Sequence, residues 1–462
     1  MFQSWKLVFS FGNFCVIVLT FVFYFSNMTH TLQELKSGTL KGLKQLKIAE
    51  GLTEFPREIF SLADTLEVLD LSDNHLASIP DEIIQLKHLR ILFFANNQFK
   101  VFPKILAQCS SLSMIGFKSN QIDTVPENAF PPRLRWLVLT NNKIAQLPKS
   151  IGACPLLQKC ALAGNLLTEL PAAMSECKNL ELLRVSANQL KEIPAWLFEL
   201  PKLSWVAFGG NPAAHSIQVD ADLESFDWND FEVKELLGEG ASGLISRAHW
   251  DSKQKDVAIK VFKGAVTSDG LPEDEMAFSI AAGNHENLVK VLGKIKGHPS
   301  KKNGLILKLI TSDFENLGNP PSLQTCTRDT FNSGTKFSHA QLLKISKSIA
   351  SVAAQLHQKG INHGDLYAHN IMINDSTDVI LGDFGAASAF VPSDELSFNI
   401  ERVEVRAFGC LLEDLIQLRD EVKMNAAQRK GWNELIEQCF IATVKKRPSF
   451  IDILAHLISF EQ

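Results

Sequence analysis

A strict repeat of hydrophobic and polar positions occupies the first half of the chain. The stretch LEVLDLSDNHLASIP, from Leu66 to Pro80, has the frame L-x-x-L-x-L-x-x-N-x-L and ends in Ile-Pro. The same frame returns along the chain, and the asparagines that mark it follow at intervals of 22 or 23 residues: Asn74, Asn97, Asn120, Asn142, Asn165, Asn188 and Asn211. A degenerate first copy begins at Leu43. Because side chains alternate along a strand, each copy predicts a short strand with its leucines facing inward.

One copy cannot bury its own leucines, so the copies must stack into a single elongated core. This pattern is typical of leucine-rich repeats and predicts an α/β solenoid over residues 43–212. We expect the asparagine side chains to bond backbone groups at the turn after each strand, forming a ladder along the stack. The repeats lack the flanking cysteine clusters common on extracellular repeat proteins.

The outward-facing residue of each predicted strand contributes to a stripe along the solenoid. It stands just before the second leucine of each frame and is mostly large and apolar: Val68, Ile91, Met114, Trp136, Lys159, Leu182 and Trp205. Such a stripe predicts a docking surface, either for a protein partner or for the chain's own second domain. The alternative is that these side chains only pack on one another along the sheet.

After the last repeat the composition changes. Residues 213–230 are polar and acidic without a repeat frame, which predicts a linker, and residues 231–462 form a second domain. This domain opens with FEVKELLGEGASGLISRAHW, in which Gly238, Gly240 and Gly243 form G-x-G-x-x-G, and VAIKVF follows with Lys260. Glycines let a backbone approach phosphate oxygens closely, and a lysine ammonium supplies a positive charge beside them.

Further motifs follow in a fixed order to the end of the chain. His363-Gly364-Asp365-Leu366 precedes Asn370, ILGDFG contains Asp383, RAFGCLLEDL follows Glu404, and KKRPSF contains Arg447. With the glycine-rich stretch and VAIK, this order resembles a eukaryotic-type protein kinase, and the whole chain resembles an intracellular leucine-rich-repeat protein kinase. The resemblance implies an α+β bilobal domain that uses ATP and Mg²⁺ and acts on a protein substrate.

The resemblance also implies roles for single residues. Asp365 would accept or orient the proton of the substrate hydroxyl, and Lys260 would contact the α- and β-phosphates. Asn370 and Asp383 would hold Mg²⁺, which prefers oxygen ligands. Glu275 is the first candidate for the glutamate that pairs with Lys260, and Glu273 is the second.

The motifs depart from the family pattern in several places. Gly364 replaces the arginine that in many kinases binds a phosphate on the activation loop, and Tyr367 stands where most serine/threonine kinases carry lysine. The segment after Asp383 is short, with no Ala-Pro-Glu triplet, so the partner of Arg447 is open between two glutamates, Glu395 and Glu401. We therefore expect no regulation by activation-loop phosphorylation.

These observations predict an ATP-dependent protein kinase of intracellular signalling, with serine/threonine specificity expected although the loop leaves tyrosine open. A non-catalytic scaffold and a small-molecule phosphotransferase are the alternatives, since H-G-D-L-x-x-x-N also occurs in kinases of small molecules. All four residues Lys260, Asp365, Asn370 and Asp383 are present, which disfavours a scaffold.

Net charge and cysteine content change these predictions little, whereas the composition of the N-terminus adds a further one. A net charge of −5 gives no reason to expect nucleic-acid binding, and eight cysteines without C-x-x-C spacing favour a reduced compartment. Residues 7–25 carry no charge and are long enough to span a bilayer. Residues 1–27 are thus either a membrane anchor, with the kinase domain on the cytoplasmic side, or a misassigned extension.

Overall fold

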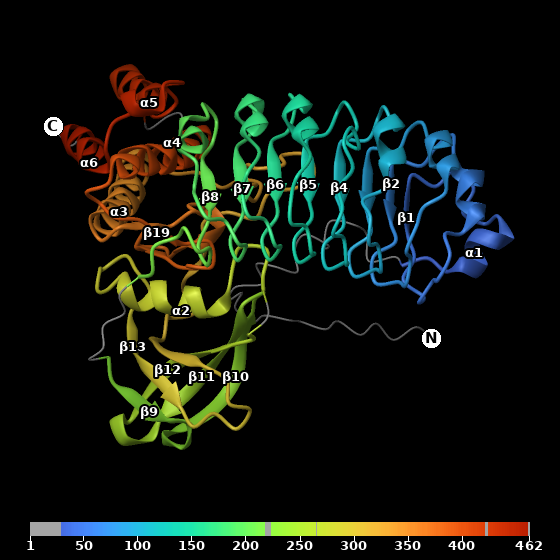
Figure 1. Ribbon diagram of the computed structural model, residues 1–462. Helices are drawn as coiled ribbons and strands as arrows, with labels where there is room; N and C mark the ends of the chain where they lie inside the picture. Colours follow the sequence, from blue (N-terminus) through green and yellow to red (C-terminus); the bar gives the residue numbers. More distant parts are fainter. Residues whose placement is uncertain (1–28, 218–222, 265, 421–423, 461–462) are drawn as a thin grey trace, which may run out of the picture.

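The computed structural model describes residues 29–217, 223–264, 266–420 and 424–460. Figure 1 shows a curved row of repeats joined to a second domain of two lobes, which confirms the expected fold class. In the described part of the chain, no helix combines the length and apolar character needed to cross a membrane. The candidate anchor at residues 7–25 lies outside the described residues.

The repeats form one parallel sheet, in which each strand pairs with the next along the chain. Its strands are β1 (Gln45–Lys47), β2 (Val68–Asp70), β3 (Ile91–Phe93), β4 (Met114–Gly116), β5 (Trp136–Val138), β6 (Lys159–Ala161), β7 (Leu182–Arg184) and β8 (Trp205–Ala207). Short 3₁₀ helices line the opposite, convex side: η1 (Arg57–Leu62), η2 (Asp81–Gln85), η3 (Lys104–Gln108), η4 (Lys149–Ala153), η5 (Ala172–Glu176) and η6 (Ala195–Glu199). Helix α1 (Leu32–Ser37) precedes the first strand.

The predicted asparagine ladder is confirmed. Asn97 is buried, and its Nδ2 donates to the carbonyl of Leu71 in the preceding repeat at 2.9 Å. Its Oδ1 accepts the backbone N–H of Leu76 at 2.8 Å. Equivalent bonds recur at Asn120, Asn142, Asn165, Asn188 and Asn211. The asparagine thus satisfies buried backbone groups that a short strand leaves unpaired, which ties each repeat to the one before it.

The second domain has a sheet-rich lobe and a helical lobe. The first sheet has the order β10-β11-β12-β14-β13-β9, and its strands are β9 (Ser225–Asp227), β10 (Phe231–Glu239), β11 (Gly243–Trp250), β12 (Lys255–Phe262), β13 (Val291–Lys296) and β14 (Gly304–Lys308). Helix α2 (Pro272–Ala281) lies between this sheet and the repeats (Figure 1). Residues 213–230, expected to be a linker, are in part structured, because β9 pairs with β13 in this sheet.

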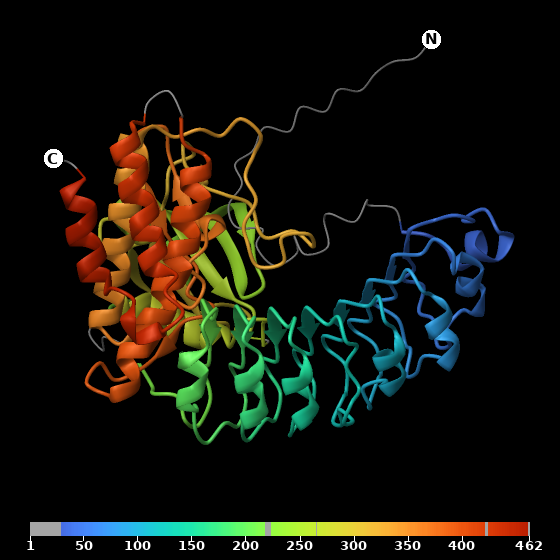
Figure 2. The same ribbon diagram turned by 90° about the horizontal axis from the view of Figure 1, so that it is seen from above.

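The helical lobe contains α3 (His339–Gln358), α4 (Glu395–Gln417), α5 (Ala426–Cys439) and α6 (Phe450–Ser459). Two small sheets carry the loops between them: β15 (Glu315–Asn316), β17 (Ile371–Ile373) and β18 (Val379–Leu381) form one, and β16 (Ile361–Asn362) and β19 (Ser388–Ala389) form the other. Figure 2 shows the second domain seated on the concave side of the repeats, towards their C-terminal end.

The apolar stripe on the concave face is covered by the chain itself. Its seven side chains are only 1% to 9% exposed. Leu182 and Trp205 belong to the same buried cluster as the core of the helical lobe. Val68, Ile91, Met114 and Trp136 pack with two residues of a second-domain loop, Leu323 and Cys326. Of the two occupants that the sequence left open, the chain's own second domain covers this surface, and the expectation of a separate protein partner at these residues is corrected.

Lys159 is the charged member of this stripe, and its burial predicts a pH-dependent stability. Burial lowers the pKa of Lys159 to about 8, and its ammonium lies 4.4 Å from the centre of the Trp136 ring. An unfolded chain keeps lysine protonated to about pH 10.4, so between about pH 8 and 10.4 the unfolded state binds more protons. The wild-type protein therefore gains stability as the pH rises through this window.

We expect the difference in unfolding free energy between wild type and Lys159→Met to shift by about 3 kcal/mol in favour of wild type between about pH 7 and pH 10.5. Denaturant unfolding at a series of pH values measures this shift. Lys255→Met, at an exposed lysine of β12, is the control and should show no such change. A pH-independent difference for Lys159→Met would contradict the buried lysine.

Candidate active site

The glycine-rich turn joins β10 to β11 above Lys260. The N–H of Gly240 donates to the carbonyl of Gly243 at 2.9 Å, which closes the turn. Gly238 lies on β10, two residues before Gly240. A Cβ on Gly243 would lie 2.6 Å from the carbonyl oxygen of Val261 and 3.4 Å from Cε of Lys260. The glycine is therefore needed for the close approach of this turn to β12.

Helix α2 brings a buried carboxylate to Lys260. The Lys260 ammonium pairs with Oε1 of Glu275, and Glu275 is 2% exposed. Of the two candidate glutamates, Glu275 is thus the buried one that contacts Lys260, whereas Glu273 is exposed on the helix. Burial raises the pKa of Glu275, and the charge of Lys260 opposes this shift. The two groups therefore stabilise one another's charged forms at the base of the turn.

Glu404 on α4 anchors the loop that carries Asp365. Its carboxylate accepts the backbone N–H of Gly364 at 2.7 Å and that of His363 at 3.2 Å, and it also bonds Nε2 of His357 at 2.7 Å. Burial alone would raise the pKa of Glu404, but the bond and charge of His357, together with the other contacts, outweigh it and lower the pKa. The buried carboxylate stays ionised and fixes the backbone beside Asp365.

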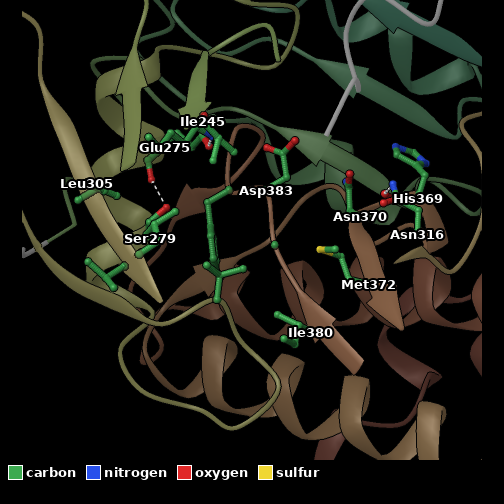
Figure 3. Close-up of a pocket in the computed structure, with 16 residues that line it drawn as sticks. Ile245, Glu275, Ser279, Leu305, Asn316, His369, Asn370, Met372, Ile380 and Asp383 are labelled. Carbon is green, nitrogen blue, oxygen red and sulfur yellow. Dashed lines mark hydrogen bonds and ion pairs between the residues drawn. The ribbon is translucent and has the colours of Figure 1, made fainter. Parts of the chain in front are cut away.

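Asn370 and Asp383 line the cleft, and Asp365 lies beside it, bonded to Asn370. Nδ2 of Asn370 donates to the Asp365 carboxylate at 2.8 Å and to its carbonyl at 2.9 Å. Asp383 adopts a left-handed backbone with φ of 58°, and its Oδ1 accepts the N–H of Gly385 at 3.1 Å. In Figure 3 the Asn370 and Asp383 side chains lie next to each other on one side of the pocket.

The donor set fits a magnesium ion that is shared with phosphates. Oδ1 of Asn370 is buried and has no hydrogen-bond partner within the described residues, and the Asp383 carboxylate lines the same pocket. Across the described ranges, no group of three or more His, Cys, Asp or Glu side chains could hold a metal by itself. Two oxygen ligands without a full cage are typical of Mg²⁺, which completes its shell with water and substrate phosphates.

Two adjoining pockets form the cleft and share Lys260, Glu275 and Asp383. The first has mostly apolar walls, from Val291, Leu305, Leu307, Met372 and Ile380 among others, which suit a flat aromatic ring. Figure 3 shows Leu305 on one side of this pocket, with Met372 and Ile380 facing it. The second pocket lies under the glycine-rich turn and is lined by Gly240, Ser242 and Gly243. Together they offer an apolar chamber next to a smaller one under the glycine-rich turn.

Gly364 lies at a close contact between the second domain and the repeats. Its φ is +72°, and an added Cβ would lie 2.6 Å from two carbonyl oxygens, those of Ala386 and of Val206 on β8. Asn362 also donates to the carbonyl of Val206, at 3.0 Å. A side chain at position 364 therefore has no room, and this explains why the family's arginine is absent.

Tyr367 is an interface residue. Its ring stacks on Trp205 of β8 with the centroids 4.4 Å apart and the planes 7° from parallel. Nε1 of Trp205 donates to the carbonyl of Leu366 at 3.2 Å. The tyrosine at the position of the usual lysine thus fastens the catalytic loop to the last repeat strand.

Arg447 does not pair with either glutamate that the sequence suggested. Its guanidinium donates to three carbonyls, of Ile441 at 2.9 Å, Arg402 at 2.9 Å and Pro201 at 2.7 Å. Glu401 instead contacts Arg402 and accepts the N–H of Phe450 at 2.9 Å. Pro201 belongs to the repeats, so the repeat domain supplies one of the acceptors for Arg447. Burial lowers the pKa of Arg447 to about 10.

The structure thus brings Lys260, Glu275, Asn370 and Asp383 to the walls of one cleft, with Gly240 and Gly243 above them. Asp365 lies beside this cleft and is bonded to Asn370. Sequence reasoning missed Arg184 of β7, whose guanidinium contacts Asp365, Asp269 and the carbonyl of Gly364. A signal was available. At the third strand position, the other repeats carry Lys47, Asp70, Phe93, Gly116, Val138, Ala161 and Ala207, so Arg184 is the one basic residue there apart from Lys47 of the degenerate first copy.

Comparisons with known proteins identify both halves of the chain. Residues 231–406 match the family described as protein tyrosine and serine/threonine kinase, and residues 64–122 match leucine rich repeat. The chain therefore combines leucine-rich repeats with a domain of the protein kinase family. A solved leucine-rich-repeat protein of Leptospira interrogans covers 40% of this chain and 54% of its own, with a TM-score of 0.35 and 23% identity, a likeness too weak to support an argument.

Two of three distant relatives of this chain are kinases by name. Cyclin-dependent kinase C-2 C of Arabidopsis thaliana is 24% identical over 41% of this chain and 28% of its own length. The probable serine/threonine-protein kinase gdt4 of Dictyostelium discoideum is 29% identical over 40% and 11%. Angiopoietin-1 receptor of Danio rerio is 23% identical over 54% and 27%. The chain spans less than a third of the length of each of these relatives.

Proposed function

We propose that this protein transfers the γ-phosphoryl group of ATP to a hydroxyl of a protein, with serine or threonine as the acceptor. The observation that carries this proposal is that Lys260, Asn370 and Asp383 line a single cleft, with Asp365 bonded to Asn370 beside it. The description of the Dictyostelium relative as a serine/threonine kinase favours that acceptor class. A cytoplasmic site of action is part of the same proposal.

Each residue has a separate task in this mechanism. The apolar pocket binds the base, and the glycine-rich turn encloses the phosphates with its backbone. Lys260, held by Glu275, orients the α- and β-phosphates, while Asn370 and Asp383 hold Mg²⁺, which when bound neutralises charge on the phosphates. Asp365 accepts or orients the proton of the acceptor hydroxyl. Catalysis therefore rests on positioning and charge stabilisation, without a covalent intermediate.

An assay with radiolabelled ATP and Mg²⁺ tests this proposal. The full chain is incubated with generic protein acceptors, and the products are separated into protein and small-molecule fractions. Label on serine or threonine of protein supports the proposal. Label found only on a small molecule would identify a small-molecule phosphotransferase. Absence of any ATP turnover would favour a non-catalytic scaffold.

A further inference from the structure

Arg184 is a repeat-domain residue buried beside the kinase site. It stands on β7 and its side chain is 3% exposed. Nη1 donates to the carbonyl of Gly364 at 2.8 Å, Nε donates to Oδ1 of Asp269 at 2.9 Å, and Nη2 contacts Oδ1 of Asp365. Asp269 lines the pocket under the glycine-rich turn. One guanidinium therefore joins the repeats to both the catalytic loop and the phosphate side of the cleft.

The guanidinium stands beside a catalytic loop that offers little positive charge of its own. Position 364 is glycine because of its close contacts, and Tyr367 is buried against Trp205. The two histidines of this loop bond other groups: Nε2 of His363 bonds the carbonyl of Gly382 at 3.0 Å, and Nδ1 of His369 bonds Asp329 at 2.7 Å. The guanidinium that contacts Asp365 comes from the repeat domain, 181 positions earlier in the chain.

The Asp365 carboxylate is held from two sides. Arg184 contacts Oδ1, and Asn370 donates to Oδ2 at 2.8 Å. Two contacts on different oxygens fix both the plane and the direction of a carboxylate, which one contact cannot do. Burial alone would lower the pKa of Arg184, but the carboxylates of Asp365 and Asp269 more than offset this and raise the pKa. The guanidinium therefore stays charged in its buried place.

We propose that Arg184 is a positioning residue for phosphoryl transfer, which makes the repeat domain a working part of the kinase active site. This inference rests on the proposed function, because it assigns Arg184 to the orientation of Asp365 in that reaction. The repeats then act on catalysis through a direct contact with the catalytic loop, whatever else they bind.

The test compares purified full-length Arg184→Gln and Arg184→Lys with wild type. Glutamine removes the charge, whereas lysine keeps it but cannot reach three acceptors at once. Arg406→Gln is the matched control, because Nη1 of Arg406 donates to Oγ of Ser204 at 2.7 Å across the same domain interface without touching Asp365. The kcat for a protein acceptor, the KM for ATP and the unfolding midpoint are measured for each variant.

We expect Arg184→Gln to lower kcat by about 10²-fold at an unchanged KM for ATP, since misplacing a reacting group by about 1 Å has this effect. Arg184→Lys should recover part of kcat, and Arg406→Gln should keep the wild-type value. If Arg184→Gln fails to fold, the test uses Arg184→Lys alone, whose kcat we expect to be reduced from the wild-type value but not abolished.

Three results would overturn the inference while leaving the proposed function intact. An unchanged kcat in Arg184→Gln, or in Arg184→Lys if that variant alone folds, would show that Asp365 needs no partner from the repeats. An increased kcat would mark the ion pair as an inhibitory contact. An equal loss in Arg406→Gln would mean that any loosening of the interface suffices. If wild type itself transfers no phosphate, the proposed function fails and takes this inference with it.

Discussion

Replacement of Asp365 by asparagine is expected to reduce phosphate transfer by about 10²- to 10⁴-fold, the contribution of a well-placed proton acceptor. Asparagine has nearly the same shape and keeps an oxygen for the bond from Asn370, but its amide group gives up the contact of Oδ1 with Arg184. It can no longer take a proton from the acceptor hydroxyl. Initial rates with radiolabelled ATP and a protein acceptor measure the loss, and the KM for ATP should change little.

Asp375→Asn provides the matched control, because Asp375 is an exposed aspartate on the turn after β17, away from the cleft. It should retain the wild-type rate. If Asp365→Asn were as active as Asp375→Asn, the catalytic role of Asp365 would have to be abandoned.

Gly364→Ala is expected to lower the unfolding free energy by about 2–5 kcal/mol. A left-handed backbone costs a non-glycine residue about 1–2 kcal/mol, and overpacking adds about 1–3 kcal/mol. The new methyl group would lie 2.6 Å from the carbonyl oxygens of Ala386 and Val206, neither of which is a flexible side-chain end. Denaturant unfolding measures the loss, and it should be accompanied by weaker contact between the repeats and the kinase domain.

Gly334→Ala separates the two causes. Gly334 also has a positive φ, of 88°, but an added Cβ would meet nothing within 4 Å. This variant should therefore lose only the backbone contribution of about 1–2 kcal/mol. Equal losses at the two positions would show that the repeats do not press on the catalytic loop at Gly364.

Much of the fold could be predicted because the signals are local or periodic. The repeat frame gives the strand positions and the asparagine ladder, since each asparagine bonds the repeat just before it in the chain. The site residues of the kinase domain could be predicted because they lie in short characteristic segments, such as Gly382-Asp383-Phe384-Gly385. The choice of Glu275 over Glu273 needed the structure, because the rotation of α2 decides which carboxylate faces Lys260.

The contacts between the two domains could not be predicted, because they join residues far apart in the sequence. Nothing near Arg184 in the chain indicates that it meets Asp365, and nothing near Arg447 indicates that the carbonyl of Pro201 accepts its hydrogen bond. The apolar stripe did indicate that something covers the concave face. The structure was needed to show that the helical lobe covers part of this face, because Leu182 and Trp205 pack into that lobe.

The packing of the repeats against the second domain gives one explanation for the positions at which this chain departs from the kinase motifs. The segment between Asp383 and α4 is short, and the last repeats lie against it: Oγ of Ser388 accepts the N–H groups of Phe208 and Gly209 at 2.9 and 3.1 Å. The repeats also supply a contact for Asp365 and for Arg447. We infer that the repeat domain takes over structural tasks that an activation segment performs in related kinases, and that phosphorylation of this segment is not needed.

A crystal structure of the full chain with Mg²⁺ and a non-hydrolysable ATP analogue tests the account most directly. The account predicts the triphosphate between the glycine-rich turn and Lys260, with Asn370 and Asp383 on the metal, and Arg184 still in contact with Asp365. A nucleotide bound elsewhere, or a repeat domain moved away from the catalytic loop in the bound state, would contradict it.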